Sequence, residues 1–138
     1  SDIIVGFPGE SENDFIKTLE VVENAEFDSV FMYKFSARPG TIAETFSDRY
    51  VPTDIIDHRF NRLKDLQTSI SKRRLSRFVH TYQEVLIEGA SKNNKNKSTG
   101  RTDNNNIVIL DNIAEPGSIE KVFITKNTPF VLYGELIS

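Results

Sequence analysis

Residues 1–11, SDIIVGFPGES, decide how the first half of the chain folds. The β-branched run at 3–5 predicts a short buried strand, and the glycine- and proline-rich segment after it predicts a sharp loop. Ser11 stands three residues before Asp14, a spacing typical of a capping box at the start of a helix. The stretch therefore predicts a strand that passes through a tight loop directly into a helix.

The residues that follow complete this pattern. Phe15, Leu19 and Val22 recur at helical spacing and predict the buried stripe of an amphipathic helix. The run 30–35, VFMYKF, predicts a second strand. Strand, helix and strand form a βαβ unit, which normally joins parallel strands. Because two strands do not make a stable sheet alone, we expect the rest of this sheet to lie outside the given sequence.

A long helix is predicted after Pro52, with Thr53 as its cap. One face carries apolar residues at steps of three and four, whereas the other faces are basic and are expected to meet solvent or phosphate. The apolar positions are Ile56, Phe60, Leu63, Leu66 and Ile70, and the basic ones are Arg59, Arg62, Lys64, Lys72, Arg73, Arg74 and Arg77.

Charge is distributed unevenly along the 138 residues, although the net charge is only −3. Residues 51–77 hold three acidic and seven basic side chains, whereas residues 1–50 hold ten acidic and four basic ones. A basic middle indicates a surface suited to a polyanion such as a nucleic acid. The chain has no cysteine, which excludes disulfides and any thiolate-based zinc or iron–sulfur site within it. No run of about 18 apolar residues predicts a membrane span.

The character of the sequence changes after residue 77. Short β-rich runs at 82–88, 106–110, 119–125 and 130–137 are separated by turn residues. This spacing predicts a small antiparallel barrel. The polar stretch 91–106 is predicted to be a long loop between strands of that barrel. We therefore expect two domains, residues 1–77 and 78–138.

Three segments are candidates for chemistry. The loop after the first strand lies where parallel α/β folds bind ligands, although a plain βα turn needs the same glycines. Arg38 follows the second strand beside a rigid Pro-Gly turn, where it could hold a carboxylate or phosphate, or else satisfy local carbonyls or Asp48. The polar loop either binds RNA through lysines and asparagines or is a solvated hairpin. Its candidate RNA-binding residues are Lys92, Lys95, Lys97, Arg101, Asn104 and Asn105.

Several motifs resemble one enzyme family. Residues 1–11 resemble the SDIIVGFPGET strand of the radical S-adenosylmethionine (SAM) methylthiotransferases, and FSARPGT at 35–41 is similar to the form in their tRNA-modifying branch, the MiaB family. IEGASK at 87–92 and GRTDNN at 100–105 are similar to VEGxSK and GRTENN of the family's C-terminal TRAM domain. LYGEL at 132–136 resembles the closing SLRGEL. The resemblance runs in order through nearly the whole chain.

This resemblance implies an α/β fold followed by an all-β fold. The first part would be the C-terminal βαβ portion of a partial TIM-type radical SAM barrel, continued by a long connecting helix. The second part would be a small antiparallel, OB-like TRAM barrel that binds RNA. The whole enzyme would be a cytoplasmic transferase that methylthiolates the isopentenylated adenosine beside the tRNA anticodon.

The resemblance also implies cofactors and partners. The full-length enzyme would use SAM and two 4Fe–4S clusters, whose cysteine ligands would lie upstream, so this chain alone is expected to be inactive and to bind no metal. Its partners would be tRNA and the upstream part of the same polypeptide. Ile4, Gly6 and Arg38 match positions near the cofactor, with Arg38 contacting SAM or the substrate nucleotide. Asn106 and Leu110 replace residues that are usually arginine and often aromatic, which predicts weaker phosphate and stacking contacts in that strand.

Two alternatives stay open at this stage. The chain could be a stand-alone RNA-binding module without catalysis. It could also belong to the branch that modifies an aspartate of a ribosomal protein, although Ser36-Ala37-Arg38-Pro39 favours the tRNA branch.

Overall fold

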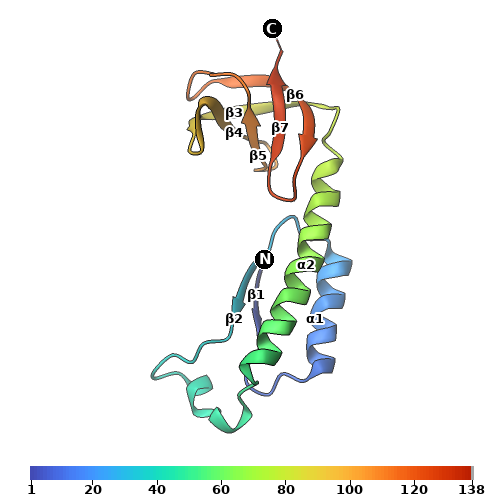
Figure 1. Ribbon diagram of the computed structural model, residues 1–138, viewed down its shortest axis with the longest axis vertical. Helices are drawn as coiled ribbons and strands as arrows, with labels where there is room; N and C mark the ends of the chain where they lie inside the picture. The colour runs from blue at the N-terminus through green and yellow to red at the C-terminus, as the bar shows by residue number, and fades with distance from the viewer. Residues whose placement is uncertain (138) are drawn as a thin grey trace. The chain divides into compact units, whose positions relative to one another are not determined.

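A computed structural model describes residues 1–137 (Figure 1). The chain divides into two compact units, of which the first is Ser1–Ser71 and the second begins at Lys72. The boundary falls within helix α2, Thr53–Ser76, so the two units share one continuous stretch of helical backbone. No helix among residues 1–137 has both the length and the apolar character that a membrane crossing requires.

The first unit is built on the predicted βαβ motif. Strand β1, Asp2–Val5, pairs in parallel with β2, Phe31–Lys34, and helix α1, Glu12–Ala25, connects them. The Ser11 side chain accepts from the Asp14 N–H, and the Asp14 carboxylate accepts from the Ser11 N–H, so the predicted capping box is confirmed. Two short 3₁₀ helices, η1 at Ile42–Thr45 and η2 at Ser47–Arg49, follow β2.

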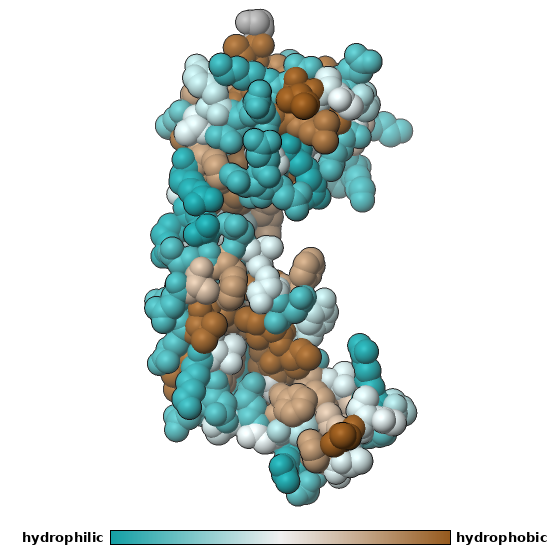
Figure 2. All heavy atoms as spheres, turned by 180° about the vertical axis from the view of Figure 1, so that it is seen from behind, coloured by the Kyte–Doolittle hydropathy of each residue, from teal (hydrophilic) through white to brown (hydrophobic). Residues whose placement is uncertain are grey.

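The two faces of the β1–β2 sheet differ sharply. One face meets the helices, and the core of the unit is a cluster of completely or almost completely buried side chains: Val5, Phe15, Val22, Leu63 and Ile70. On the other face Ile4, Phe31 and Tyr33 are each more than half exposed. Figure 2 shows hydrophobic side chains gathered in the part of the molecule where β1 and β2 lie. This unit therefore leaves an apolar sheet face open.

Helix α2 supplies most of the cover for the buried face. Its predicted apolar seam is confirmed, because Ile56, Leu63 and Ile70 are buried. Gln67 and Ser71 donate hydrogen bonds to the carbonyls of Phe27 and Asp28, which fixes the turn before β2 against the helix. Thr53 is the first helical residue rather than the cap that we predicted.

The second unit is a closed five-stranded barrel with the order β3-β4-β5-β7-β6. The strands are β3 Tyr82–Ser91, β4 Asn94–Thr102, β5 Ile107–Leu110, β6 Ile119–Asn127 and β7 Leu132–Leu136. The predicted barrel is thus confirmed, but it is mixed rather than fully antiparallel, because β5 and β7 pair in parallel. β5 is antiparallel to β4 and therefore runs in the direction of β3. β7 is antiparallel to β6, which is itself antiparallel to β3, so β7 runs in the same direction as β5 and the two pair in parallel.

The prediction of a long loop at 91–106 was wrong. Residues 94–102 form β4, which pairs with β3 on one side and with β5 on the other. The alternation of buried Ser98, Gly100 and Thr102 with more exposed neighbours is a strand pattern in which small side chains replace large apolar ones. Gly100 is needed there because a Cβ would lie 2.5 Å from the Leu86 carbonyl oxygen. A polar strand of this kind gives no hydrophobic signal in the sequence.

Candidate functional site

The loop after β1 is held in a conformation that only glycine adopts easily. Gly6 has a φ of +80°, and a Cβ at this position would lie 2.4 Å from Cγ1 of Ile56 on α2. Its N–H donates to Oε1 of Glu10 at 3.2 Å. Gly6 thus allows the loop to approach α2 closely and to place its N–H against the Glu10 carboxylate.

Arg59 anchors this loop from α2. Its Nη1 donates to the backbone carbonyl of Glu10 at 3.0 Å and to the Glu10 carboxylate at 2.9 Å. Its Nε donates to the carboxylate of Glu12 at 3.2 Å, and its guanidinium lies 5.8 Å from the centre of the Phe15 ring. Arg59 is only 5% exposed, so the prediction that it belongs to a solvent-facing basic surface was wrong. The sequence offered one signal for this role, the acidic pair that flanks Ser11.

The acidic start of α1 is stabilised in its charged form. Hydrogen bonding to Arg62 lowers the pKa of Glu12 below its usual value, opposed by desolvation and assisted by Arg59. Hydrogen bonds from the hydroxyl and the N–H of Ser11 lower the pKa of Asp14. Both carboxylates therefore serve the helix terminus, and their geometry supports no acid–base chemistry.

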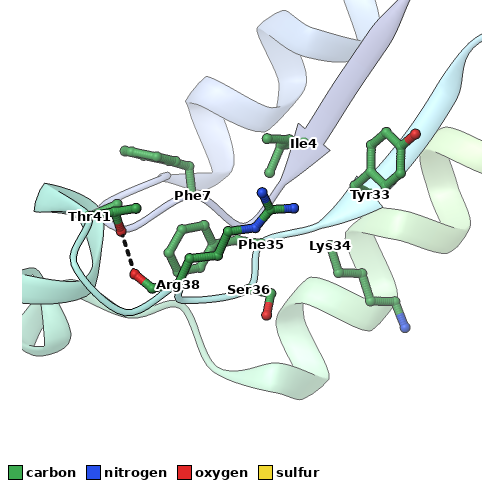
Figure 3. A pocket seen from close by; sticks show the side chains of 9 residues that line it. Ile4, Phe7, Tyr33, Lys34, Phe35, Ser36, Arg38 and Thr41 are labelled. Carbon is green, nitrogen blue, oxygen red and sulfur yellow. Dashed lines mark hydrogen bonds between the residues drawn. The ribbon is translucent and has the colours of Figure 1, made fainter.

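An open pocket of about 550 Å³ lies on the exposed side of the sheet (Figure 3). Phe35 contacts Phe7 edge to face, with ring centres 5.5 Å apart, and lies 5.8 Å from Tyr50. The lining is otherwise mixed in character, and it comprises Ile4, Phe7, Tyr33, Lys34, Phe35, Ser36, Arg38, Thr41 and Ala43. The structure thus brings Ile4 and Arg38, two of the predicted cofactor-binding residues, into one pocket, and Gly6 lies in the adjoining loop.

Arg38 extends from a braced turn. The Thr41 hydroxyl donates to its carbonyl at 2.8 Å, and the Gly40 N–H donates to the Glu44 carboxylate at 2.8 Å. In Figure 3 its guanidinium points toward Ile4. Among residues 1–137 it has no ion-pair partner, so the alternative that it satisfies Asp48 is wrong. A free guanidinium beside aromatic rings is suited to an anionic group on a planar ligand.

The predicted RNA-binding residues gather on β4 and the two turns that flank it. Lys97 and Arg101 share the outward-facing side of β4, since Ser98, Gly100 and Thr102 are buried, and Lys95 lies in the exposed start of the same strand. Lys92 is exposed in the β3–β4 turn, and Asn104 and Asn105 are exposed in the β4–β5 turn. The structure therefore places all six on one strand and its ends, and we name them the basic face.

Two members of the basic face already have acidic partners. Lys97 lies 2.6 Å from the Asp111 carboxylate and lowers its pKa. Arg101 lies 3.1 Å from the Glu88 carboxylate and also donates to the Asn105 side chain at 3.1 Å. Lys92 and Lys95 have no such partner within residues 1–137. Within the described residues, Lys92 and Lys95 are thus the two lysines of this face whose charge no neighbouring carboxylate offsets.

Two further possibilities from the sequence concern base stacking at Leu110 and metal binding. Leu110 is completely buried in the barrel core, so its side chain is not available for base stacking, and the expectation of weaker stacking in this strand stays a prediction. Within the described residues no group of three or more His, Asp or Glu side chains could hold a metal ion.

Comparison with known proteins covers both units. The family model described as TRAM domain matches residues 76–137. Over 99% of its length the chain is 43% identical to a tRNA-2-methylthio-N(6)-dimethylallyladenosine synthase of Clostridium botulinum. Proteins of the same name from Clostridium tetani and Fusobacterium nucleatum are 42% and 39% identical over 98% and 99% of the chain. The chain spans only 30–32% of the length of these relatives.

Proposed function

We propose that this chain, with its TRAM domain, is the C-terminal part of a radical SAM methylthiotransferase that modifies tRNA. The observation that carries this proposal is the extent of the similarity, since it runs through both units and covers 99% of the chain. Residues 1–77 would close the cofactor-binding domain, and residues 78–138 would bind the tRNA. The names of the relatives favour the tRNA branch over the one that modifies a ribosomal protein.

The sheet of unit 1 supports its assignment to a partial TIM-type barrel. β1 pairs only with β2, so each strand keeps one unpaired edge within the described residues. The face opposite the helices is apolar and open at Ile4, Phe31 and Tyr33. In a barrel of parallel strands, helices cover the outside, while neighbouring strands pair with the edges and the inner faces enclose a shared interior. Unit 1 has the properties expected of one βαβ segment of such a barrel.

The lining of the pocket in unit 1 supports the proposal that this unit contributes to SAM binding. Its aromatic and aliphatic side chains are suited to an adenine ring, and Ile4 and Gly6 would contribute to the contacts with the base. Arg38 would hold the carboxylate of SAM or a phosphate of the substrate nucleotide. Glu10 is already engaged by Gly6 and Arg59, so its part is to shape the loop rather than to contact the ligand.

The residues of this chain can be compared with those that hold an iron–sulfur cluster. Such clusters are held mainly by cysteine thiolates, and the chain has no cysteine. The residues present therefore do not fit a cluster. We propose that the cluster ligands come from a part of the enzyme that this sequence does not contain.

The activity is tested with a chimera in which this chain replaces the matching segment of the Clostridium botulinum relative. The modified nucleosides of its tRNA are then measured by mass spectrometry. We expect 2-methylthio adenosine from the chimera and much less from its Arg38→Ala variant. Lys64→Ala, which removes an exposed cation of α2 outside the pocket, is the matched control and should leave the yield unchanged. A folded, cluster-loaded chimera without activity contradicts the proposal.

The RNA-binding part is tested with the chain itself. A labelled tRNA is titrated at two salt concentrations, and affinity should fall steeply as salt rises because phosphate contacts release counterions. Binding without activity in the chimera supports the alternative of an RNA-binding module. A chain that binds no tRNA at low salt refutes the role of unit 2.

A further inference from the structure

A cluster of aromatic side chains lies on the barrel outside the basic face. Tyr82 of β3 stands opposite Phe123 of β6 in register, and their ring centres are 5.2 Å apart. The His80 ring is stacked on Phe123, with centres 6.3 Å apart and planes 16° from parallel. We name these three residues the aromatic cluster. Tyr82 is 59% exposed and His80 is also exposed, so the cluster offers ring faces to a partner.

The backbone at His80 is unusual for a residue with a side chain. Its φ is +64°, in the left-handed region that residues other than glycine adopt uncommonly. The backbone is locked there, since the His80 N–H donates to the Ile124 carbonyl and the Ile124 N–H donates to the Thr81 carbonyl. An exposed imidazole contributes little to the core. Strain of this kind, held in place by its surroundings, is often found at binding sites, and here it presents a ring beside two others.

The charges around the cluster are mixed. Lys121 lies 5.1 Å from the centre of the Tyr82 ring, while Glu84 is opposite Lys121 and Glu135 is opposite Phe123 in register. With one ammonium group and two carboxylates close by, this surface is not a phosphate-binding site by itself. Its recognition must come mainly from the rings, which favours a partner with exposed flat faces.

The position of the cluster links it to the basic face. β3 lies between β4 and β6 in the barrel, and Leu86 of β3 pairs with Arg101 on one side and with Ile119 on the other. Tyr82 is four residues before Leu86 and nine before Ser91, which pairs with Asn94, so the cluster lies roughly 13 Å along β3 from the level of Arg101 and roughly 30 Å from the start of β4. These distances correspond to a few nucleotides of an extended strand. One nucleotide strand can therefore reach both surfaces.

We propose that the aromatic cluster is a base-stacking site for single-stranded RNA whose backbone contacts the basic face. The proposal rests on the proposed RNA binding of unit 2. Unstacked bases have flat faces that aromatic side chains receive without regard to sequence, whereas a duplex hides those faces. The relatives, which act on tRNA by their names, supply the reason to choose RNA over a protein partner.

The test uses the 138-residue chain and two labelled probes at low salt: a short single-stranded RNA, and an abasic strand with the same number of phosphates. Wild type should bind the RNA more tightly than the abasic strand. Tyr82→Ala should weaken RNA binding about 5- to 150-fold and leave binding of the abasic strand unchanged. Phe130→Ala, which removes a 71% exposed aromatic ring outside the cluster, is the matched control and should change neither affinity.

A second variant separates binding from folding. His80→Gly relieves the left-handed backbone, so its thermal stability should equal or exceed that of wild type while its RNA affinity falls. Tyr82→Ala and His80→Gly variants that bind RNA as wild type does overturn the proposal but leave the RNA function of unit 2 standing. Wild-type chain that binds neither probe nor tRNA refutes that function, and this proposal with it. Loss of affinity for the two probes in equal measure also overturns stacking.

Discussion

Replacing Arg59 with methionine should destabilise unit 1 while leaving the barrel intact. The substitution keeps an unbranched side chain on α2 but removes both hydrogen bonds that Arg59 donates to Glu10 at the end of the Gly6–Glu10 loop. The Glu10 carboxylate, whose side chain is only 11% exposed, would then lose its one charged partner. The Glu10 backbone carbonyl would lose its donor as well.

The magnitude follows from the burial of the pair. Removing one partner of a buried ion pair costs about 3–5 kcal/mol, because the remaining charge is left without compensation. We expect about 3 kcal/mol, the lower end, since Glu10 keeps some exposure and still accepts from Gly6. Replacing Glu10 with methionine as well removes the buried charge and should recover part of the loss. Recovery stays incomplete because the Gly6 N–H then lacks its acceptor, which costs about 1–3 kcal/mol.

Amide hydrogen exchange measures the two units separately in one sample. In Arg59→Met the amides of α1 should exchange roughly 100-fold faster, which corresponds to about 3 kcal/mol, while those of β6 should be unchanged. Arg62→Met is the matched control, since Arg62 is on the same helix and binds Glu12, but in an exposed pair. Its effect should be much smaller. If the two variants exchange alike, the burial of Arg59 does not have the consequence that we derive from it.

Three further predictions concern other parts of the chain. Gly6→Ala should destabilise unit 1 far more than Gly40→Ala in thermal unfolding. Both glycines have positive φ, but only at Gly6 would a Cβ collide with Ile56. Equal losses of thermal stability in the two variants would contradict this. The lowered pKa of Asp14 predicts stability that is present above its ordinary pKa of 3.8 and is lost as pH falls below it. Acid unfolding of Asp14→Asn should therefore be less steep than that of wild type, and parallel curves would argue against the cap. Lys95→Ala should lower tRNA affinity and reduce the slope of log K against log salt by about one. Lys97→Ala should change both quantities less, because Lys97 is paired with Asp111. A larger effect of Lys97→Ala than of Lys95→Ala would show that the pair opens on binding.

Local patterns were sufficient to predict the βαβ unit and the seam of α2. Each rests on periodicity or on a contact between residues three or four apart, such as the capping of α1 by Ser11. Arg59 could not be predicted in the same way, because its partners are 47 and 49 residues away and only the folded chain brings them together. An arginine beside an apolar seam has the same sequence pattern whether its guanidinium meets solvent or a buried carboxylate.

The sequence did not predict strand β4, for a different reason. Its inward residues, Ser98, Gly100 and Thr102, are buried but small, and at Gly100 a Cβ would collide with the Leu86 carbonyl oxygen of β3. Hydrophobic alternation is thus replaced by alternation of size. The Ser98 hydroxyl also accepts a hydrogen bond from the Ala114 N–H at 2.8 Å, which ties the β5–β6 connection to β4. The asparagine and lysine residues at the start of β4 are typical of loops, so the sequence indicated a loop there.

The pairing of β4 with its two neighbours explains why part of the basic face has fixed spacing. Because residues 98–101 of β4 pair with both β3 and β5, Arg101 is fixed at strand spacing, and Lys97 directly precedes this paired stretch. Residues 97 and 101 are four positions apart, which places their Cα atoms about 13 Å from each other along the strand. A fixed row of cations selects a nucleic acid by the path of its backbone, whereas flexible lysines would bind any polyanion. We therefore expect unit 2 to discriminate between RNA shapes more strongly than its charge alone would allow, and a comparison of a tRNA with a heparin chain at matched charge density measures that difference directly.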